Sequence, residues 1–248
     1  MKNNELLAIK DSIINDIRNW FDENGPESKA IIGISGGKDS TVSAALLVEA
    51  LGKDRVIGVL MPNGIQSDII DSKKIVNFLD INSMTINISD MYNAFIRRLG
   101  NEFEVSEDTK INLPPRIRMS ILYGIAQSMN GRVINTCNYS EDYVGYSTKY
   151  GDSAGDISIL GNLLVREIIE LGDILGLPYD LVHKAPSDGL CGKTDEDRFG
   201  FTYNDIETYI RNGTTGNEDI DKKIEYMHNS SRHKYKDMYI CFNNKSNI

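Results

Sequence analysis

The stretch AIIGISGGKDSTVSAALLVEAL, residues 30–51, decides the fold of this chain. Its beginning, residues 30–35, is a short apolar run of the kind that forms a strand buried on both faces. Gly36 and Gly37 then break the run, and an apolar segment at residues 41–51 suits a buried helix. A strand, a tight glycine turn and a helix form the first part of a βαβ unit, so this stretch predicts a parallel sheet.

The same alternation continues on both sides of this stretch. Upstream, apolar residues at helical spacing predict an amphipathic first helix that ends near residues 25–26, where a glycine precedes a proline. Downstream, strands are predicted at residues 55–60, 83–88 and 132–136, and helices at residues 67–79, 91–99 and 116–129. Right-handed crossovers join such parallel strands. We therefore predict an α/β fold with an open twisted parallel sheet and helices on both faces, which is Rossmann-like in class.

Three polar segments interrupt this pattern and are predicted to be loops, at residues 100–110, 138–156 and 185–199. Further helices are predicted at residues 162–175, 178–184, 203–211 and 217–231. The chain shows no internal repeat, low-complexity tract or linker. We therefore expect residues 1–248 to form a single domain.

Composition narrows the class of protein. The 248 residues include 27 Lys and Arg against 36 Asp and Glu, a net charge of −9, whereas a general nucleic-acid binder needs a basic face. Cys137, Cys191 and Cys241 lie far apart, which disfavours a zinc ribbon, a redox dithiol and a disulfide framework. No stretch resembles a signal peptide or reaches the ~20 apolar residues of a membrane span. We predict a cytoplasmic protein without a nucleic-acid or membrane partner.

The segment Ser35-Gly-Gly-Lys-Asp-Ser40 carries the clearest functional chemistry. Its glycines allow the backbone to approach an anion, and the helix that follows offers free N–H groups to a phosphate. The segment lacks the Walker A pattern, because Asp39 follows Lys38, and it lacks the G-x-G-x-x-G pattern of dinucleotide sites. A carboxylate at Asp39 beside a phosphate implies a bridging cation such as Mg²⁺. The alternative is a plain glycine turn with an acidic helix cap.

This loop resembles the S-G-G-x-D-S loop of the adenine-nucleotide α-hydrolase-like superfamily, the N-type ATP pyrophosphatases. The resemblance implies cleavage of ATP between its α and β phosphates and adenylation of a substrate. The loop alone does not choose among NAD synthetases, GMP synthetases, asparagine and argininosuccinate synthetases, and tRNA-modifying enzymes.

Five further segments, in order along the chain, resemble those of the NAD synthetase family. They are NLPPRIRM at residues 112–119, TCNYSE at 136–141, STKYGD at 147–152, KAPS at 184–187 followed by TDED at 194–197, and HK at 233–234. The resemblance implies an ammonia-dependent ligase without a glutaminase domain. It implies amidation of deamido-NAD to NAD through an adenylated intermediate, with release of AMP and pyrophosphate.

The resemblance also implies the site residues. ATP would contact Gly33, Ile34, Ser35, Gly36, Gly37, Lys38, Asp39, Ser40, Gln66, Thr136 and Ser187. Deamido-NAD would contact Asn112, Arg116, Tyr123, Lys149, Asp156, His233 and Lys234. Asp39 and Glu141 are predicted to hold Mg²⁺, because both follow strands whose carboxyl ends meet at one edge of the sheet. Asp152 or Asp156 is a candidate for holding ammonium before it loses a proton.

The family resemblance further implies a homodimer with a shared substrate site, to which the first helix contributes. Trp20 and Phe21 are therefore candidates for stacking on an aromatic ring of the substrate, with plain core or interface packing as the alternative. Family members carry ATP-binding cations where this chain has Leu60 and Val165, and Lys38 or Arg166 are candidate replacements. A tRNA-modifying relative and a catalytically silent ATP-binding dimer remain the alternative functions.

Overall fold

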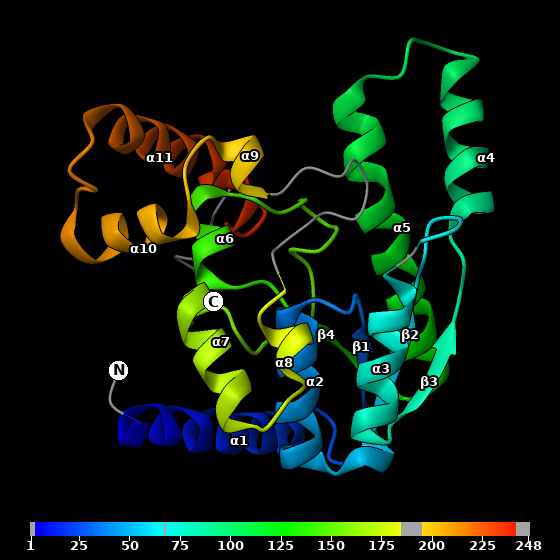
Figure 1. Ribbon diagram of the computed structural model, residues 1–248. Helices are drawn as coiled ribbons and strands as arrows, with labels where there is room; N and C mark the ends of the chain where they lie inside the picture. The colour runs from blue at the N-terminus through cyan, green and yellow to red at the C-terminus, as the bar shows by residue number, and fades with distance from the viewer. Residues whose placement is uncertain (1–2, 67, 185–194, 242–248) are drawn as a thin grey trace, which may run out of the picture.

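A five-stranded parallel sheet forms the centre of the computed structural model, which describes residues 3–66, 68–184 and 195–241 (Figure 1). The strands lie in the order β3-β2-β1-β4-β5. They span Lys29–Gly33 (β1), Val56–Leu60 (β2), Asn82–Thr85 (β3), Gly131–Asn135 (β4) and Ile157–Ser158 (β5). Ile31 of β1 is in register with Ile57 of β2 and Val133 of β4, so apolar side chains line up across the sheet.

One face of the sheet is covered by five helices that share a single apolar core. They are α1 (Asn3–Asn24), α2 (Lys38–Leu51), α3 (Ile69–Leu79), α7 (Val165–Ile174) and α8 (Tyr179–Val182). Ala30 and Ile32 of β1 point into this core, where Phe21 of α1 and Leu46 of α2 are fully buried. A short 3-10 turn, η1 (Lys53–Arg55), leads from α2 into β2.

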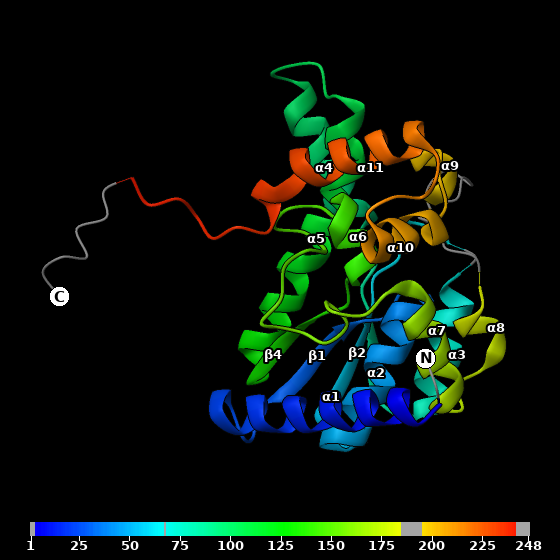
Figure 2. The same ribbon diagram turned by 90° about the vertical axis from the view of Figure 1, so that its left-hand side faces the viewer.

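The opposite face is covered by α4 (Ser89–Gly100) and α5 (Glu107–Ser128). Ile31 and Ile57 point to this side and pack with Ile117 and Leu122 of α5. Alternate residues of β1 therefore enter opposite cores, as expected for a strand covered on both faces. Figure 2 shows the strands between α5 on one side and α2, α7 and α8 on the other. The predicted sheet and its two helical layers are confirmed.

A smaller helical cluster lies beyond the carboxyl ends of the strands. It consists of α6 (Tyr139–Val144), α9 (Asp195–Phe199), α10 (Tyr203–Asn212) and α11 (Glu218–Ser231), followed by the 3-10 turn η2 (Arg232–Lys234). Its own apolar core includes Val144, Phe199, Ile206 and Ile224. This cluster lies over the carboxyl ends of the strands (Figure 1).

Most of the predicted helices and strands are present, with ends that differ by a few residues. The loop predicted at residues 100–110 is confirmed only for residues 101–106, because α4 ends at Gly100 and α5 begins at Glu107 rather than near residue 116. Pro114 and Pro115 lie inside this helix, although each removes a donor and disfavours a helix interior. The helix starts earlier because the Ser106 side chain accepts the Thr109 N–H at 3.2 Å and acidic residues occupy the first turn.

The other two predicted loops also contain helices. Within residues 138–156, α6 forms because the Asn138 side chain accepts the Glu141 N–H at 3.0 Å, and Gly145 ends the helix in the left-handed conformation. Within residues 185–199, the last part is α9, and residues 185–194 lie outside the described residues. The described helices include none long and apolar enough to cross a membrane.

Candidate active site

A cavity of about 610 Å³ opens at the carboxyl ends of β1, β2 and β4, beneath the small helical cluster. This is the edge at which parallel α/β sheets bind ligands. Twelve of the residues predicted for the site line it: Gly33, Ile34, Ser35, Gly37, Lys38, Asp39, Gln66, Asn112, Thr136, Glu141, Asp152 and Lys234. The structure therefore joins residues that are up to two hundred positions apart (Gly33 and Lys234) in one space.

The loop between β1 and α2 is held in shape by its own serines. The Ser40 hydroxyl accepts the Ser35 N–H at 3.2 Å, and the Ser35 hydroxyl accepts the Gly37 N–H at 3.2 Å. Gly36 adopts a φ of 80°, and a Cβ there would lie 2.8 Å from both the Asp71 Cβ and the Ser72 N. Only glycine fits this position, so the loop is pressed against α3 and α2 can begin at Lys38.

The Asp39 carboxylate has one neighbour on each oxygen. Its Oδ1 accepts a hydrogen bond from Asn138 Nδ2 at 3.1 Å, and its Oδ2 lies 2.9 Å from Lys38 Nζ. Asn138 is fully buried and also caps α6, so the amide that orients Asp39 is itself fixed. Lys38 is buried as well and lies over the Tyr203 ring, with Nζ 5.6 Å from the ring centroid.

Glu141 faces the same cavity from α6. Its Oε1 accepts a hydrogen bond from the Tyr203 hydroxyl at 3.4 Å. Tyr203 thus contacts both Lys38, which pairs with Asp39, and Glu141. Within the described residues, no group of three or more His, Cys, Asp or Glu side chains could hold a metal ion. Asp39 and Glu141 both line the cavity, so these two carboxylates could share a hard cation with phosphate oxygens.

The other predicted ATP contacts differ in what the structure says of them. Thr136 and Gln66 line the cavity, and Gln66 Oε1 accepts the Asn63 N–H at 2.6 Å. Ser187 lies outside the described residues.

The residues predicted for deamido-NAD fall into two sets. Asn112 and Lys234 line the cavity, and Lys234 Nζ donates to the carbonyls of Gly145 and Ser147 at 2.8 and 2.9 Å. Burial lowers the pKa of Lys234, while the charge of Asp152 acts in the opposite direction.

The second set lies outside this cavity and is linked through hydrogen bonds. Arg116 Nε donates to the Lys149 carbonyl at 3.3 Å, and Lys149 Nζ donates to the His233 carbonyl at 2.9 Å. The Tyr123 hydroxyl donates to Asp156 Oδ1 at 3.2 Å. Burial and the Asp156 charge raise the pKa of Tyr123 to about 12, so its hydroxyl stays a donor. Asp156 lines a second cavity of about 340 Å³, which Lys234 also lines.

Asp152, in the loop that follows α6, is held by hydrogen bonds. Its Oδ1 accepts the Thr148 N–H at 2.9 Å, and its carbonyl accepts Asn135 Nδ2 at 2.8 Å. Burial raises the pKa of Asp152, and the Thr148 hydrogen bond opposes that rise only in part. A carboxyl whose pKa is raised accepts a proton more readily than an ordinary aspartate does.

Comparison with known proteins identifies the family. A family model described as NAD synthase matches residues 9–241. The chain belongs to the NAD synthase family. An NH3-dependent NAD(+) synthetase of Methanosarcina acetivorans is 39% identical, over 84% of this chain and 82% of that protein.

Two solved structures are similar over nearly the whole chain. An NMN synthetase from Francisella tularensis has a TM-score of 0.88 at 34% identity, over 96% of this chain and 99% of that one. An NH3-dependent NAD synthetase from Campylobacter jejuni, in complex with nitrate, has a TM-score of 0.79 at 27% identity, with the same coverage.

Two departures from the NAD synthase family pattern concern cations. Leu60 and Val165, the positions at which the resemblance implies ATP-binding cations in many members, are buried in apolar cores. Of the two candidate replacements, Lys38 lines the cavity. Arg166 instead lies 3.7 Å from Glu170 on the exposed side of α7, so its proposal as a phosphate ligand is not supported.

The sequence analysis missed three cavity cations of this NAD synthase chain, Arg118, Lys184 and Arg198. Lys184 Nζ lies 2.6 Å from Asp71 Oδ2, beside the phosphate loop. Each lies within or next to a segment that resembles the family, and this position was the signal in the sequence that could have identified it as a cavity residue.

The suggestion that Phe21 stacks on the substrate was wrong. Phe21 is fully buried in the core beneath α2, with the Arg55 guanidinium 5.5 Å from its ring centroid. Trp20 packs edge-on against Phe21, with ring centroids 5.3 Å apart, and is partly buried on the same core. The apolar stripe of α1 points inward and packs in the core on one face of the sheet. Core packing is the alternative that was weighed from the sequence.

Proposed function

We propose that this chain catalyses the amidation of deamido-NAD by ammonia, using ATP and releasing NAD, AMP and pyrophosphate. The observation that carries this proposal is the convergence of the phosphate loop, Asp39, Glu141, Asn112 and Lys234 on one cavity. Membership of the NAD synthase family and the NH3-dependent relatives support it. Such an enzyme is a ligase that forms a C–N bond.

In the first step, a carboxylate oxygen of the nicotinate ring attacks the α-phosphorus of ATP. The bond from the α-phosphorus to the bridging oxygen breaks, and its electron pair leaves on pyrophosphate. The loop at residues 35–40 and the N-terminus of α2 offer backbone N–H groups to that leaving group. Because serine hydroxyls already hold the loop, these donors need little reorganisation during the reaction.

Mg²⁺ fits the two carboxylates, because hard oxygen donors are what this ion prefers. Asp39 and Glu141 would hold it, with phosphate oxygens and water as the remaining ligands. When bound, the ion polarises the phosphates and offsets the charge that develops on pyrophosphate. Asn138 orients Asp39, and Tyr203 contacts Glu141, so both carboxylates are positioned in advance.

In the second step, ammonia attacks the acyl carbon and AMP leaves. We assign the proton released from nitrogen to Asp152, which lines the cavity and whose pKa is raised by burial. A site that excludes water at this stage would protect the acyl adenylate from hydrolysis.

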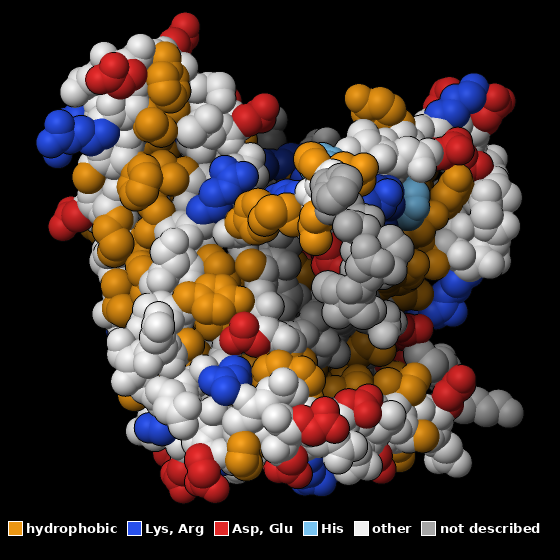
Figure 3. All heavy atoms as spheres, turned by 180° about the vertical axis from the view of Figure 1, so that it is seen from behind, with side chains coloured by type: hydrophobic (Ala, Val, Ile, Leu, Met, Phe, Trp, Pro, Cys, Tyr) orange, Lys and Arg blue, Asp and Glu red, His pale blue; other side chains and the backbone are white. Residues whose placement is uncertain are grey.

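We propose that the active unit is a homodimer in which a second copy covers the exposed face of α5. Arg116 and Tyr123 lie on this face outside the cavity, so a substrate that contacts them needs a second wall. Figure 3 shows hydrophobic side chains gathered over α4 and α5, and Phe95 of α4 is 52% exposed. A cytoplasmic location is proposed because Cys137 and Cys241 are free thiols, which suit a reducing compartment.

A second candidate acceptor is nicotinate mononucleotide, the carboxylate whose amidation gives NMN. The similarity to the Francisella tularensis NMN synthetase favours it, with a TM-score of 0.88 against 0.79 for the Campylobacter jejuni enzyme. Both acceptors present the same nicotinate carboxylate to ATP. They differ in the adenylate half, which the smaller one lacks.

The test is to incubate the chain with ATP, Mg²⁺, ammonium and either acceptor, and to quantify NAD, NMN, AMP and pyrophosphate. We expect AMP in equal amounts to the amidated product, and the ratio of kcat/KM for the two acceptors identifies the substrate. Asp39→Ala and Glu141→Ala should each abolish turnover, whereas Asp16→Ala on the exposed side of α1 should not. Bound ATP without product from either acceptor would instead favour a silent ATP-binding dimer, and adenylation of tRNA would favour a tRNA-modifying enzyme.

A further inference from the structure

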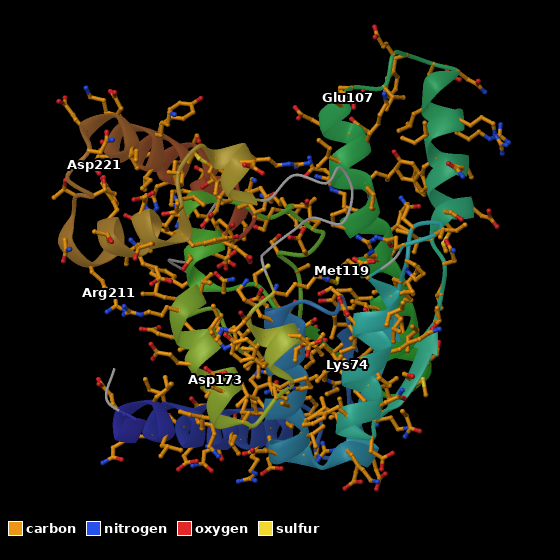
Figure 4. The ribbon with its side chains drawn as sticks, in the orientation of Figure 1. Lys74, Glu107, Met119, Asp173, Arg211 and Asp221 are labelled. Carbon is orange, nitrogen blue, oxygen red and sulfur yellow. The ribbon has the colours of Figure 1, made fainter. Side chains whose placement is uncertain are left out.

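Arg118 is a half-buried arginine in α5 whose charge has no carboxylate partner among the described residues. Its Nε donates to the carbonyl of Met61 at 3.0 Å, and this is the one hydrogen bond that its guanidinium makes within the part of the chain that the structure describes. The side chain lines the 610 Å³ cavity, as does Met119 beside it, which Figure 4 labels on α5. The terminal nitrogens therefore remain available to a ligand.

The other cations around the cavity are already engaged. Lys38 pairs with Asp39, Lys184 pairs with Asp71, and Lys234 donates to two carbonyls. An arginine with open donors in a partly desolvated place costs free energy unless an anion meets it there. Burial lowers the pKa of the Arg118 guanidinium, and the charges of Asp68 and Asp152 act against that shift. Neither carboxylate forms an ion pair with it among the described residues.

Arg118 lies near two different segments that line the cavity, because the charges of Asp68 and Asp152 both act on its guanidinium. Asp68 belongs to the segment that leads from β2 into α3, beside the phosphate loop. Asp152 belongs to the loop that follows α6, which is joined to Asn112 through the Thr148 hydroxyl and is predicted to face the nicotinate substrate. The bond between the carboxylate and the α-phosphorus must form where these two segments meet.

We propose that Arg118 is a catalytic residue that binds the non-bridging oxygens of the α-phosphate while the acyl adenylate forms. In that step the carboxylate oxygen bonds to the α-phosphorus, the bond to the bridging oxygen breaks, and the electron pair leaves on pyrophosphate. Negative charge gathers on the non-bridging oxygens between these two events. A guanidinium matches two such oxygens with parallel N–H groups.

The hydrogen bond to the Met61 carbonyl orients the Arg118 guanidinium before the α-phosphate binds. It fixes Nε, so the plane and direction of the guanidinium are set before ATP arrives. The arrangement also explains how the site tolerates Leu60, which is buried in the apolar core and supplies no charge. Arg118 brings a cation from α5 to the same strand end, one residue from Leu60.

The inference rests on the proposed adenylation chemistry, so the experiment measures that step by itself. The assay is acceptor-dependent exchange of labelled pyrophosphate into ATP, run with deamido-NAD and with nicotinate mononucleotide. The variants are Arg118→Gln, Arg118→Lys and Arg118→Ala, and the matched control is Arg98→Gln, which removes an exposed arginine of α4. ATP affinity and thermal unfolding are measured for each variant.

We expect Arg118→Gln to slow exchange by on the order of 100-fold or more, with ATP affinity changed by only a few-fold, because the contact strengthens as charge develops. Arg118→Lys keeps the charge but loses the fork, so its rate should lie between those of Arg118→Gln and the parent chain. Added guanidinium should partly restore the exchange rate of Arg118→Ala, and an equal concentration of sodium chloride should not restore it.

Three outcomes would overturn the inference. One is exchange in Arg118→Gln within a few-fold of the parent chain. Another is a loss that parallels a fall in the unfolding temperature and that guanidinium does not restore, which would make Arg118 a structural tie to Met61. If Arg118→Gln does not fold, an exchange rate in Arg118→Lys equal to that of the parent chain would also contradict the inference, because lysine lacks the parallel N–H groups of the guanidinium. A parent chain that exchanges with neither acceptor would instead contradict the proposed function.

Discussion

A single buried amide controls the carboxylate on which the proposed metal site depends. Asn138 donates to Asp39 Oδ1 at 3.1 Å and accepts the Glu141 N–H at 3.0 Å. It thus touches both proposed metal ligands, one through its side chain and one through the backbone. A residue of this kind is an orienting partner, whose loss weakens a metal site without removing a ligand.

We predict that Asn138→Ser weakens Mg²⁺ binding at the proposed site by about 10- to 100-fold, because the amide donor to Asp39 is lost. Serine is a good helix cap, so α6 should still form and the unfolding temperature should change little. The measurement is the Mg²⁺ concentration that gives half-maximal turnover at saturating ATP. A variant with unchanged Mg²⁺ dependence would show that Asn138 serves α6 alone.

How far single residues could be predicted depends on where their partners lie. The phosphate loop was evident from the sequence because its pattern, residues 35–40, is contiguous. The partners of Gly36 and Asp39 elsewhere in the chain, such as Asn138, appear only in the folded structure. Arg118 depends on Met61, which is 57 positions away, and on a cavity that only the folded chain creates. Phe21 was misjudged because an aromatic side chain on an apolar helix face serves a core and a ligand equally well.

At the scale of elements, α5 and the loop at residues 147–152 behave as one unit. The Thr148 hydroxyl donates to Asn112 Oδ1 at 2.7 Å, and Gly151 lies against Pro115. A Cβ on Gly151 would lie 2.9 Å from the Pro115 Cβ and 3.0 Å from the Thr148 Cβ. The loop can lie this close to α5 because residue 151 has no side chain.

We predict that Gly151→Ala destabilises the chain by about 1–3 kcal/mol, because the added methyl overpacks this contact. It should also raise the KM for the acceptor, since Asn112 and Asp152 lie on the two sides of it. Denaturant unfolding measures the first effect and initial rates the second. Gly100→Ala is the control, because a Cβ there meets nothing within 4 Å. Equal stability of the two variants would contradict the prediction.

The connection between α10 and α11 is tied by Asp221. This carboxylate accepts hydrogen bonds from the hydroxyls of Thr214 and Thr215 and from the Thr215 N–H, which lower its pKa (Figure 4 labels Asp221). A lowered pKa in the folded state means that the folded chain binds the proton less tightly than the unfolded chain. The stability that Asp221 adds is therefore present above its ordinary pKa of 3.8 and is lost as the pH falls through the lowered value.

We predict that Asp221→Asn lowers the unfolding temperature at neutral pH by a small amount, about 2 °C. The difference from the parent chain should shrink as the pH falls below 3.8. Asp219→Asn is the matched control, because it removes the same charge from the same first turn of α11. An equal effect of both substitutions would assign the change to the helix dipole rather than to the threonine contacts.

Helices and strands could be predicted where the apolar periodicity extends over many residues. The prediction failed where a capping side chain determines the start of a helix. Strands β1 to β4 and helices α2, α10 and α11 follow from apolar patterns, whereas the two-residue strand β5 was not predicted. The first turn of α5 and most of α6 are polar, and they form because Ser106 and Asn138 supply acceptors to backbone N–H groups. Composition alone assigns such segments to loops.

At the scale of the whole molecule, charge and substrate have the same sign. The chain has a net charge of −9, yet ATP and both candidate acceptors are anions. Five cations line the cavity, namely Lys38, Arg118, Lys184, Arg198 and Lys234. Five carboxylates line it as well, namely Asp39, Asp68, Asp108, Glu141 and Asp152. The cavity is therefore formally neutral inside an acidic chain, and its cations offset the repulsion that an anion would otherwise meet there.

The last prediction concerns the second copy that we propose to cover the exposed face of α5. Gly124 lies on this face, and a Cβ there meets nothing within 4 Å, so Gly124→Arg is harmless to a single copy and improves helix propensity. If two copies meet here, the new arginine enters the interface, and sedimentation should show monomers with at least about tenfold lower activity. Asn229→Arg adds the same charge to the exposed side of α11 and should leave both dimer and activity intact. A fully active Gly124→Arg dimer would place the contact elsewhere, and a fully active monomer would show that the site at Arg116 and Tyr123 needs no partner.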